Sequence, residues 1–441
     1  MASEPTDGNS SPLTSTRLQH PGPARQLGLM SPGQLIAISA YWFATNFHWG
    51  ALLTILMPSQ VAHIDPVHQA QSLSRIWAIG ALVAAVMPPL IGAFSDRCHS
   101  PWGRRRPFMI VGVAVNILGL LFMWHAWQLA NLQFYFLAYL VIQFGNTTAT
   151  GSYSGIIPDL VREEQQGQAS GYMAAMTQLG TVLGALFVGY LLSSGHAAAS
   201  FGLIAVVLLL FLGLSAAGIR ERPLDSPQSP INWLSFFRGF WIDPRRFPDF
   251  AWVWITRALV MLGMYSIVPF ILFYLRDMIH APHPERLAGL LMTSILLGSA
   301  VTGIMGGIIS DRVGRKRVVY VSNVILAIGS ISFLFIHSLP ALFTFGTLYG
   351  FGLGAYYSVD WALGCAVLPD KEDAARGMGV WHIAMVLPQS IAPSIAAALL
   401  DHFGHTSNGG YSRDGYSAIF VLAAFFLLLG AFLLRNVKSV R

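Results

Sequence analysis

Twelve long stretches of mostly apolar residues divide the sequence between Leu35 and Leu434. Each is close to the about 20 residues that an α-helix needs to cross the hydrocarbon core of a bilayer. Because the stretches are continuous and not alternating in polarity, they favour helices over a transmembrane β-barrel. The sequence therefore predicts an all-α integral membrane protein with twelve transmembrane helices, at about 34–57, 73–95, 106–127, 133–157, 167–192, 199–219, 251–275, 287–309, 317–337, 340–368, 377–400 and 415–434.

The composition also indicates a lipid environment. Hydrophobic residues make up 54% of the chain and charged residues 10%, whereas soluble domains average roughly 45–50% and about 25%. The polar residues 1–33 lack the apolar core of a signal peptide and are expected to form a disordered cytoplasmic tail. Cys98 and Cys365, the two cysteines, have no metal-ligand spacing. Neither a metal nor a cofactor is therefore expected.

Lys and Arg collect in alternate loops, although the net charge of +6 alone would also suit a nucleic-acid partner. The basic segments are the N-terminal tail, 97–106, 220–246, 312–317, 371–376 and the residues after 434. By the positive-inside rule, this distribution places these loops and both termini in the cytoplasm. We expect a multi-pass protein of the plasma (inner) membrane. Its partner would be the lipid bilayer, and no nucleic-acid partner is expected.

Three pairs of matching segments indicate an internal duplication. The segment GAFSDRCHSPWGRRRPF resembles GGIISDRVGRKRV, so that Asp96 matches Asp311; the proline pairs are Pro158 with Pro369 and Pro58 with Pro269. The separation within each pair is nearly constant, which predicts two six-helix bundles, 34–219 and 251–435, followed by a tail at 436–441. Two such halves are related by a pseudo-two-fold axis along the membrane normal, with the solute site expected between them near midplane.

The segment 220–250 between the halves is predicted to be a cytoplasmic linker. Its stretch INWLSFFRGFW has aromatic residues at helical spacing. An amphipathic segment of this kind rests on a membrane surface, although an aromatic anchor within a plain linker is the simpler interpretation.

The loop from Asp311 to Arg317 looks like the signature of the major facilitator superfamily, whose fold the two bundles would adopt. The segments SDRCHSPWGRRRPF, FHWGALLTILMP and PFILFY resemble those of sucrose/proton symporters of the glycoside-pentoside-hexuronide type and their animal and bacterial relatives. One departure concerns the fourth helix, where the plant transporters carry an aspartate. Here Gly145 and Asn146 occupy that region, and the first acid is Asp159. A proton-coupling residue cannot be transferred from that helix.

The resemblance implies a cytoplasmic gate. Asp96 would pair with Arg104 or Arg105 and accept hydrogen bonds from a helix N-terminus of the opposite half, a contact that exists only while the cytoplasmic side is closed. The alternative is that these are ordinary interfacial charges, which explains the arginines but not an acid at the same place in both halves. The predicted gate residues are Asp96, Arg97, Gly103, Arg104, Arg105, Asp159, Asp311, Arg312, Arg315, Asp370 and Arg376.

Ionisable residues inside the membrane are rare and indicate function by default. Here they are His48, Arg257, Asp360 and His382. In this superfamily helices one, four, seven and ten line the cavity, which favours Arg257 and Asp360, with His48 as a further proton-coupling candidate. Asp360 lies about 13 Å along its helix from Pro369 at 1.5 Å per residue. Burial disfavours its charged form and a nearby cation favours it, so its proton occupancy would depend on the state of the cavity.

Each of these residues also has a structural interpretation. Arg257 could extend to the interface, it could form a fixed pair with Asp360, and His48 or His382 could bond to a neighbouring helix. For a sugar, amides would bind hydroxyl groups and rings would contact C–H surfaces. The predicted solute-binding residues are Asn46, His48, Gln143, Asn146, Gln178, Arg257, Tyr265, Tyr357, Asp360, Trp361, Trp381, His382 and Gln389.

Together these features predict a monomeric, proton-coupled symporter for uptake of a sugar or glycoside. Its partners would be the small-molecule solute and the proton, and its two halves would rock about a central site. Sodium as the coupling ion, an efflux antiporter for sugars or drugs, and a transport-inactive solute receptor remain alternatives. A membrane enzyme is not expected, because neither a nucleophile motif nor a metal cluster is found, and the absence of a P-loop argues against ATP-driven pumping.

Overall fold

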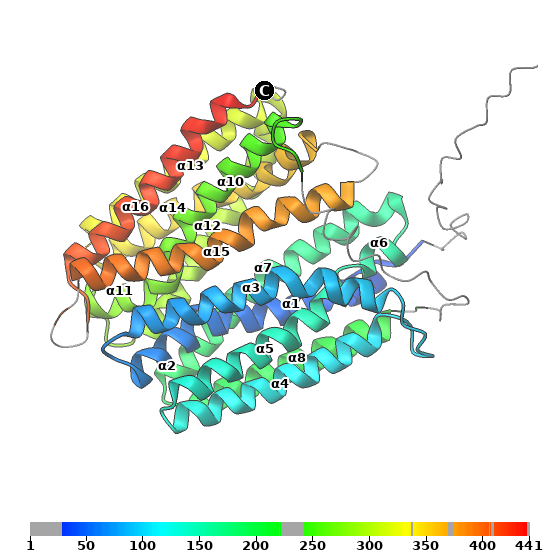
Figure 1. Ribbon diagram of the computed structural model, residues 1–441, viewed down its shortest axis with the longest axis horizontal. Helices are drawn as coiled ribbons and strands as arrows, with labels where there is room; N and C mark the ends of the chain where they lie inside the picture. Colours follow the sequence, from blue (N-terminus) through cyan, green and yellow to red (C-terminus); the bar gives the residue numbers. More distant parts are fainter. Residues whose placement is uncertain are drawn as a thin grey trace, which may run out of the picture.

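The computed structural model describes residues 29–219, 221, 242–336, 338–368, 374–404, 406 and 410–438. The predicted tail before residue 29 and most of the predicted linker lie outside these residues. Within the described residues the chain forms twelve long helical segments, arranged as two bundles (Figure 1).

The N-terminal bundle begins with a segment of three parts: α1 (Pro32–Ala51), the π-helical turn η1 (Leu52–Leu56) and α2 (Met57–Ile64). Its other elements are α3 (Gln69–Ser95), α4 (Arg106–Gln128), α5 (Leu132–Tyr153), the short α6 (Ile156–Leu160), α7 (Glu163–Ser193) and α8 (Ala197–Gly218). The C-terminal bundle begins with α10 (Pro248–Ile267), η2 (Val268–Phe270) and α11 (Ile271–Asp277). It continues with α12 (Pro284–Val313), α13 (Arg315–Ser332), η3 (Phe333–Phe335), α14 (Leu339–Ala366), α15 (Ala374–Gly404), α16 (Arg413–Leu433) and η4 (Leu434–Asn436).

The matched segments of the sequence adopt matched backbone features. Pro58 follows the π-helical turn η1, and Pro269 lies within the 3₁₀ turn η2. A proline lacks an N–H and its ring crowds the preceding turn, which explains why the helix changes its hydrogen-bond pattern at both places. Gly103 and Gly314 share a φ of 98°, a conformation that favours glycine. The duplication is therefore visible in the backbone as well as in the sequence.

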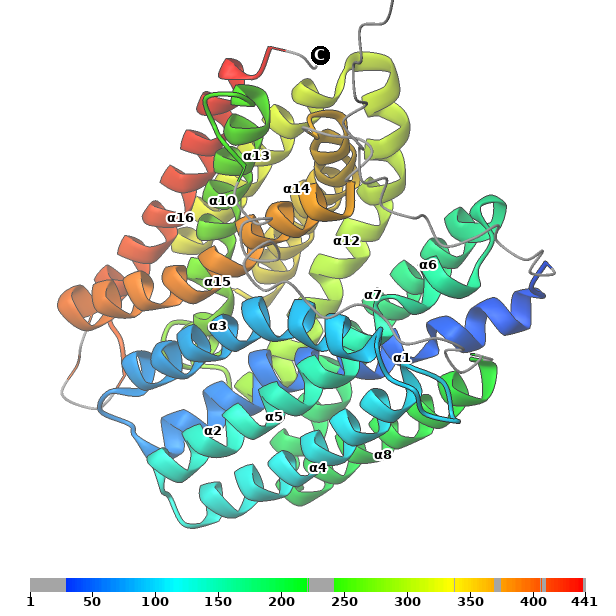
Figure 2. The ribbon, with the colours of Figure 1, turned by 45° about the vertical axis from the view of Figure 1, so that its right-hand side comes forward.

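The two bundles meet along α3 with α15 and α7 with α12. We call the end of the molecule that carries α2 and α11 the closed end, because polar contacts join the bundles there. These contacts are Ser59 with Glu285, Gln69 with Arg276, and Ala70 with Tyr411. From the closed end the ribbons of the two bundles diverge (Figures 1 and 2). We call the opposite end, with the loops at Asp96–Arg105 and Gly314, the basic end.

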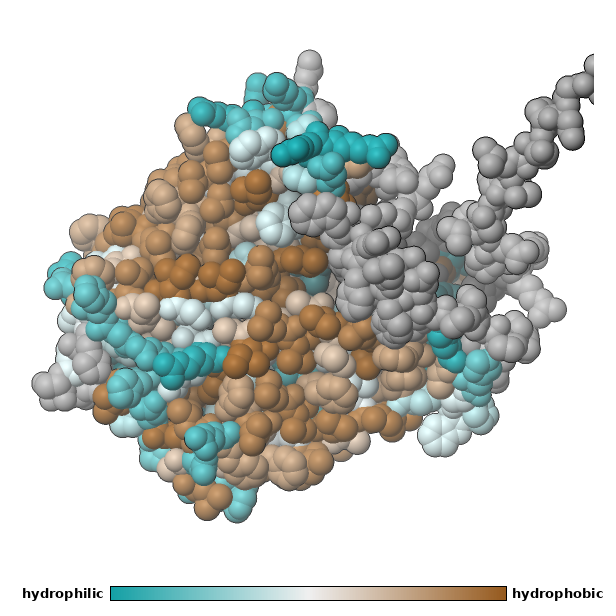
Figure 3. Space-filling model, viewed as in Figure 1, coloured by the Kyte–Doolittle hydropathy of each residue, from teal (hydrophilic) through white to brown (hydrophobic). Residues whose placement is uncertain are grey.

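Apolar side chains cover the outer surface between the two ends (Figure 3). Among the described residues nine segments are long and apolar enough to cross a membrane by length and composition alone. The segments of α1, α5 and α14 are not among these nine. They hold the predicted site residues Asn46 and His48, Gln143 and Asn146, and Tyr357 and Asp360, respectively.

Candidate functional site

An arginine and an aspartate from two helices form a buried ion pair in the C-terminal bundle. Arg257 lies on α10 and Asp360 on α14, and Nη1 of the arginine donates to Oδ2 of the aspartate. Each side chain is 6% exposed. Removing a charge from water costs several kcal/mol unless the charge is paired and hydrogen-bonded. The pairing explains how both charges are accommodated within the membrane-spanning helices.

Two aromatic side chains complete the surroundings of this pair. The hydroxyl of Tyr356, one turn before Asp360 on α14, donates to Oδ1 of the aspartate at 3.0 Å. The guanidinium carbon of Arg257 lies 4.5 Å from the ring centroid of Trp381, on α15, a cation–π arrangement. Each carboxylate oxygen therefore has a donor, and the guanidinium has a carboxylate and an aromatic face as partners.

The two partners of the pair differ from the sequence-based expectation in opposite directions. Because α14 ends at Ala366, Asp360 is about 9 Å from the end of its helix at 1.5 Å per residue, which is nearer the helix end than the count from Pro369 suggested. Because α10 starts at Pro248 and not near residue 251, Arg257 is about 13 Å from the start of its helix, which is deeper than expected.

Three other predicted residues interact electrostatically with Arg257: Tyr265, Tyr357 and His382. Tyr357 is 41% exposed and His382 is also exposed, in contrast to the buried pair. A phenol and an imidazole both donate and accept hydrogen bonds, so they suit the hydroxyl groups of a solute. With Arg257 and Asp360 they form what we call the C-terminal polar cluster.

The predicted site residues of the N-terminal bundle have no hydrogen bond to this cluster within the described residues; their partners lie within their own bundle. Thr45 donates to the side-chain oxygen of Asn146 at 2.8 Å, and Asn46 donates to the carbonyl of Trp42 at 2.8 Å. His48 is fully buried, its ring lies 4.6 Å from that of Trp49, and neither of its nitrogens has a hydrogen-bond partner among the described residues.

The remaining predicted solute-binding residues have mixed surroundings. Gln143 is buried with an unpartnered side-chain oxygen, as far as the described residues show. Gln178 on α7 is exposed and Gln389 on α15 is half-buried. The side chain of Trp361 lies outside the described part of the structure. Among the described residues no contact places these amides, Asn46 or His48 beside Asp360, and their solute-binding role stays a prediction.

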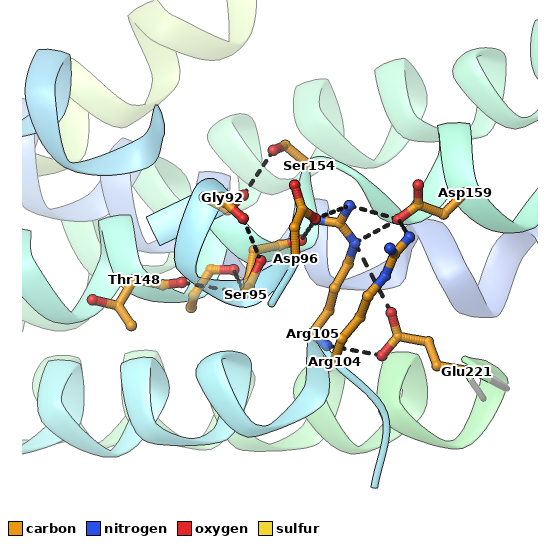
Figure 4. Close-up of polar contacts among 12 residues, drawn as sticks. Gly92, Ser95, Asp96, Arg104, Arg105, Thr148, Ser154, Asp159 and Glu221 are labelled. Atoms are coloured by element: carbon orange, nitrogen blue, oxygen red, sulfur yellow. Dashed lines mark hydrogen bonds and ion pairs between the residues drawn. The ribbon is translucent and has the colours of Figure 1, made fainter. Parts of the chain in front are cut away.

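Charged residues form a compact cluster at the basic end of the N-terminal bundle (Figure 4). Arg105 is its centre: the guanidinium pairs with Asp159 at 2.5 Å and with Asp96 at 3.0 Å, and donates to the carbonyl of Ser152 at 2.9 Å. Arg104 also pairs with Asp159, at 2.6 Å. The backbone N–H of Arg105 donates to Glu221 at 2.9 Å. We call these residues the Arg105 cluster.

The local backbone makes room for the Arg105 cluster. Gly155 lies against the guanidinium of Arg105, and an added Cβ would collide with it. Gly103, at the φ of 98°, places its Cα against the side chain of Glu221. Every contact named here joins parts of the N-terminal half, so Asp96 pairs within its own bundle while the two bundles diverge at this end.

The corresponding loop of the C-terminal bundle has different contacts. Lys316, at the position of Arg105 after the matched glycine, donates to the carbonyl of Val437 at 2.6 Å. Arg312 is exposed and Arg315 is half-buried, and Arg97 of the first loop donates to the carbonyl of Ala93 at 2.8 Å. Asp370 and the side chains of Asp311 and Arg376 lie outside the described residues, so their gate roles stay predictions.

Sequence reasoning did not single out Glu221 or the residues that join the bundles at the closed end. There, Asp277 binds Arg276 at 2.6 Å, the N–H of Tyr411 at 3.1 Å and the hydroxyl of Tyr416 at 2.8 Å. Arg276 also donates to Gln69 of the other bundle at 2.9 Å. These residues stand at helix ends, where charged and polar residues are common, so the sequence offered no signal that distinguished them.

Comparison with known families gives one match over most of the chain. The model of the family described as MFS/sugar transport protein matches residues 59–437. The Sucrose transport protein SUC4 of Arabidopsis thaliana is 24% identical over 427 residues, which cover 81% of this chain and 82% of the relative. The Multi-drug resistance efflux pump PmrA of Streptococcus pneumoniae is 22% identical and covers 82% of this chain and 89% of its own.

Solved structures of the same fold have low sequence identity to this chain. A bacterial homologue of the human lysosomal transporter Spinster, in an inward-facing and unoccupied conformation, is 17% identical with a TM-score of 0.67, covering 93% of this chain and 98% of its own. The nucleoside transporter NupG is 14% identical with a TM-score of 0.67, covering 93% and 100%. These similarities establish the architecture.

Proposed function

This chain belongs to the MFS/sugar transport protein family, and we propose that it takes up a sugar or glycoside together with a proton. The Arg257–Asp360 pair is the observation that supports coupling to protons. With Asp360 ionised, the pair is neutral overall and held by an ion-pair hydrogen bond. Uptake of a proton by Asp360 removes the anion beside Arg257, so the two protonation states favour different arrangements of α10 and α14.

The side chains around the pair support a polyhydroxy solute. Tyr357 and His382 are accessible, and both interact electrostatically with Arg257. A sugar bound against them would change the surroundings of Asp360, and by linkage the proton would change the affinity for the sugar by the same factor. Amides of the N-terminal bundle, Asn46 and Gln143 among them, would supply the contacts from the opposite side.

The arrangement of the bundles supports alternating access. Under the positive-inside rule the basic end faces the cytoplasm, so the bundles in this structure are joined on the outer side and diverge on the inner side. Rocking would separate the contacts at the closed end and bring the Arg105 cluster against the C-terminal bundle. Asp96, whose side chain is 42% exposed, would then be free to meet a helix N-terminus there.

The test is uptake by purified protein in liposomes. Radiolabelled sucrose and a panel of other mono- and disaccharides would be offered with and without a pH gradient that is acidic outside. We expect one or more sugars to accumulate above equilibrium only with the gradient, and a protonophore to abolish accumulation. An equal sodium gradient at constant pH is the control, and accumulation driven by sodium alone would contradict proton coupling.

An efflux antiporter is the second candidate, because the match to a multi-drug efflux pump covers as much of this chain as the match to a sucrose transporter. In the same liposomes an antiporter would move protons and solute in opposite directions. Sugar-induced alkalinisation of the outer medium indicates symport, whereas acidification indicates antiport. Binding of sugar without movement of sugar or protons would indicate a receptor.

A further inference from the structure

A second buried polar side chain lies beside the Arg257–Asp360 pair. Asn323 on α13 has no exposed surface, and neither atom of its amide group has a hydrogen-bond partner among the described residues. The Nε of Arg257 is also without one within that part of the chain. A buried polar group left without a hydrogen-bond partner is destabilising, because it has lost its bonds to water. Asn323 is therefore expensive to keep in the state described here.

Asn323 and the ion pair face the same small cleft. The cleft lies between α10, α13 and α14 and has room for about one water molecule. Its polar lining consists of Thr256 and Arg257 from α10, Asn323 from α13, and Tyr356 and Asp360 from α14. Val253, Val319 and Leu363 also line it, and all three are buried. The amide and the guanidinium thus line one cleft.

We propose that Asn323 is an alternative hydrogen-bond partner of Arg257. When Asp360 takes up a proton, the amide oxygen of Asn323 accepts from the guanidinium, directly or through one water molecule. This inference rests on the proposed function, because it requires Asp360 to bind a proton during transport. In that step the carboxylate becomes a neutral acid and no other bond forms or breaks. Arg257 retains the face of Trp381 but loses its anion, and the amide oxygen of Asn323 is an unused acceptor in the same cleft.

Other groups around Arg257 could also respond to protonation. The charged and titratable side chains that interact with it are Tyr265 on its own helix, Asp360, Tyr356 and Tyr357 on α14, and His382 on α15. Among these only Asp360 is a carboxylic acid, and among the described residues that line the cleft only Asn323 has a side-chain oxygen with no hydrogen-bond partner. Asn323 acts in this proposal as a positioning residue, because it works through Arg257.

The N-terminal bundle provides a matched control. Asn116 on α4 is equally buried, and both of its amide atoms are likewise without partners in the described residues. In its bundle α4 occupies the place that α13 occupies in the other. Asn116 does not line the cleft of the ion pair. A change at Asn116 therefore removes the same buried amide without touching Arg257.

The test measures the protonated fraction of Asp360 directly. Infrared difference spectra of the purified full-length protein would follow the C=O stretch of the protonated carboxyl group with pH, and Asp360→Asn in each background would identify the band. Asn323→Val removes the alternative acceptor, so the protonated fraction at a given pH should fall. Asn323→Asp supplies a stronger acceptor for Arg257, so that fraction should rise. A change of about tenfold in the ratio of protonated to ionised Asp360 corresponds to 1.4 kcal/mol.

The opposite signs of these two variants separate positioning from general damage to the fold. Asn116→Val and Asn116→Asp should leave the ratio unchanged. The inference would be overturned if wild type and both Asn323 variants had the same ratio of protonated to ionised Asp360, or if the Asn116 variants changed that ratio in the same way. If Asn323→Val does not fold, the direction of the change in Asn323→Asp decides. The infrared titration needs no sugar, so its outcome is independent of whether liposomes accumulate sugar. Failure of wild-type protein to accumulate any sugar would instead count against the proposed function.

Discussion

In the N-terminal bundle Arg105 lies at the basic end with three carboxylates around it, whereas in the C-terminal bundle Arg257 lies inside the span with one. The loop of Arg105 and the loop of Lys316 share the same glycine conformation. The duplicated backbone has thus been kept while the charges have diverged. A cluster near water can tolerate more carboxylates than guanidinium groups. Inside the membrane the charges of the pair must cancel, so protonation of Asp360 would leave the charge of Arg257 without its counter-ion.

The largest effect is expected from neutralising the membrane-embedded acid. Asp360→Asn should abolish accumulation driven by a pH gradient and retain exchange of labelled sugar at equal concentrations, because the site could still bind and reorient without a proton. Liposome accumulation and exchange would be measured side by side. Asp414→Asn, which changes an exposed acid at the start of α16, is the control.

Two other interpretations of the pair predict different results for that variant. If the pair is only structural, Asp360→Asn and Arg257→Met should both fail to fold. If Asp360 only binds sugar hydroxyl groups, the variant should bind more weakly at every pH while remaining coupled. Accumulation at the wild-type level would remove Asp360 as the coupling site and make His48 the next candidate.

A smaller effect should distinguish the two end loops. Arg105→Gln removes the guanidinium that pairs with Asp96 and Asp159 and donates to the carbonyl of Ser152, at about 1–3 kcal/mol for each buried group left unsatisfied, while the backbone N–H keeps its bond to Glu221. Lys316→Gln removes one hydrogen bond to Val437, worth about 1 kcal/mol. Thermal unfolding in detergent should therefore show the larger loss for Arg105→Gln. Equal losses would mean that the Arg105 cluster contributes no more than a single surface contact.

The gate role assigned to Asp96 predicts a change in conformational population. If Asp96 closes the basic end through the opposite bundle in another state, Asp96→Asn should favour the state in which this end is open. Labelling of Ser154→Cys, at an exposed position of the basic end, should become faster in a background in which both native cysteines are replaced, Cys98→Ser and Cys365→Ser. An unchanged labelling rate together with normal transport would reduce Asp96 to an interfacial charge.

The architecture was predictable because its signals are local. Long apolar stretches, the proline pair Pro58 and Pro269, and the repeated Asp-Arg loops each lie within a short segment, and the fold agrees with them. Arg257 and Asp360 could be identified by their rarity inside the membrane. Their ion pair could not be derived, because its partners are 103 residues apart and the packing of α10 on α14 determines the contact.

Other residues of the site gave no signal in the sequence. Glu221 was assigned only to a linker, and its contact with Arg105 depends on how the loop folds back. Asn323 is an amide in a helix, and amides often connect transmembrane helices. Only its unpartnered burial next to the cleft distinguishes it from such a residue. Non-local packing therefore decides which of many polar residues become part of a site.

The smallest expected effect concerns the two matched glycines. Gly103 and Gly314 have the same φ of 98°, so alanine at either position should cost about 1–3 kcal/mol in backbone strain. At Gly103 an added Cβ would also lie 2.6 Å from Oε2 and 2.7 Å from Cβ of Glu221, and would displace the acceptor of the Arg105 N–H. Gly103→Ala should therefore lower the unfolding temperature more than Gly314→Ala, by the equivalent of about 1 kcal/mol for that hydrogen bond. In a Glu221→Ala background the two alanine variants should lower the unfolding temperature equally, because the side chain that the added Cβ would meet is then absent. If Gly103→Ala still lowers it more, the difference between the loops arises from their backbones and not from the Arg105 cluster.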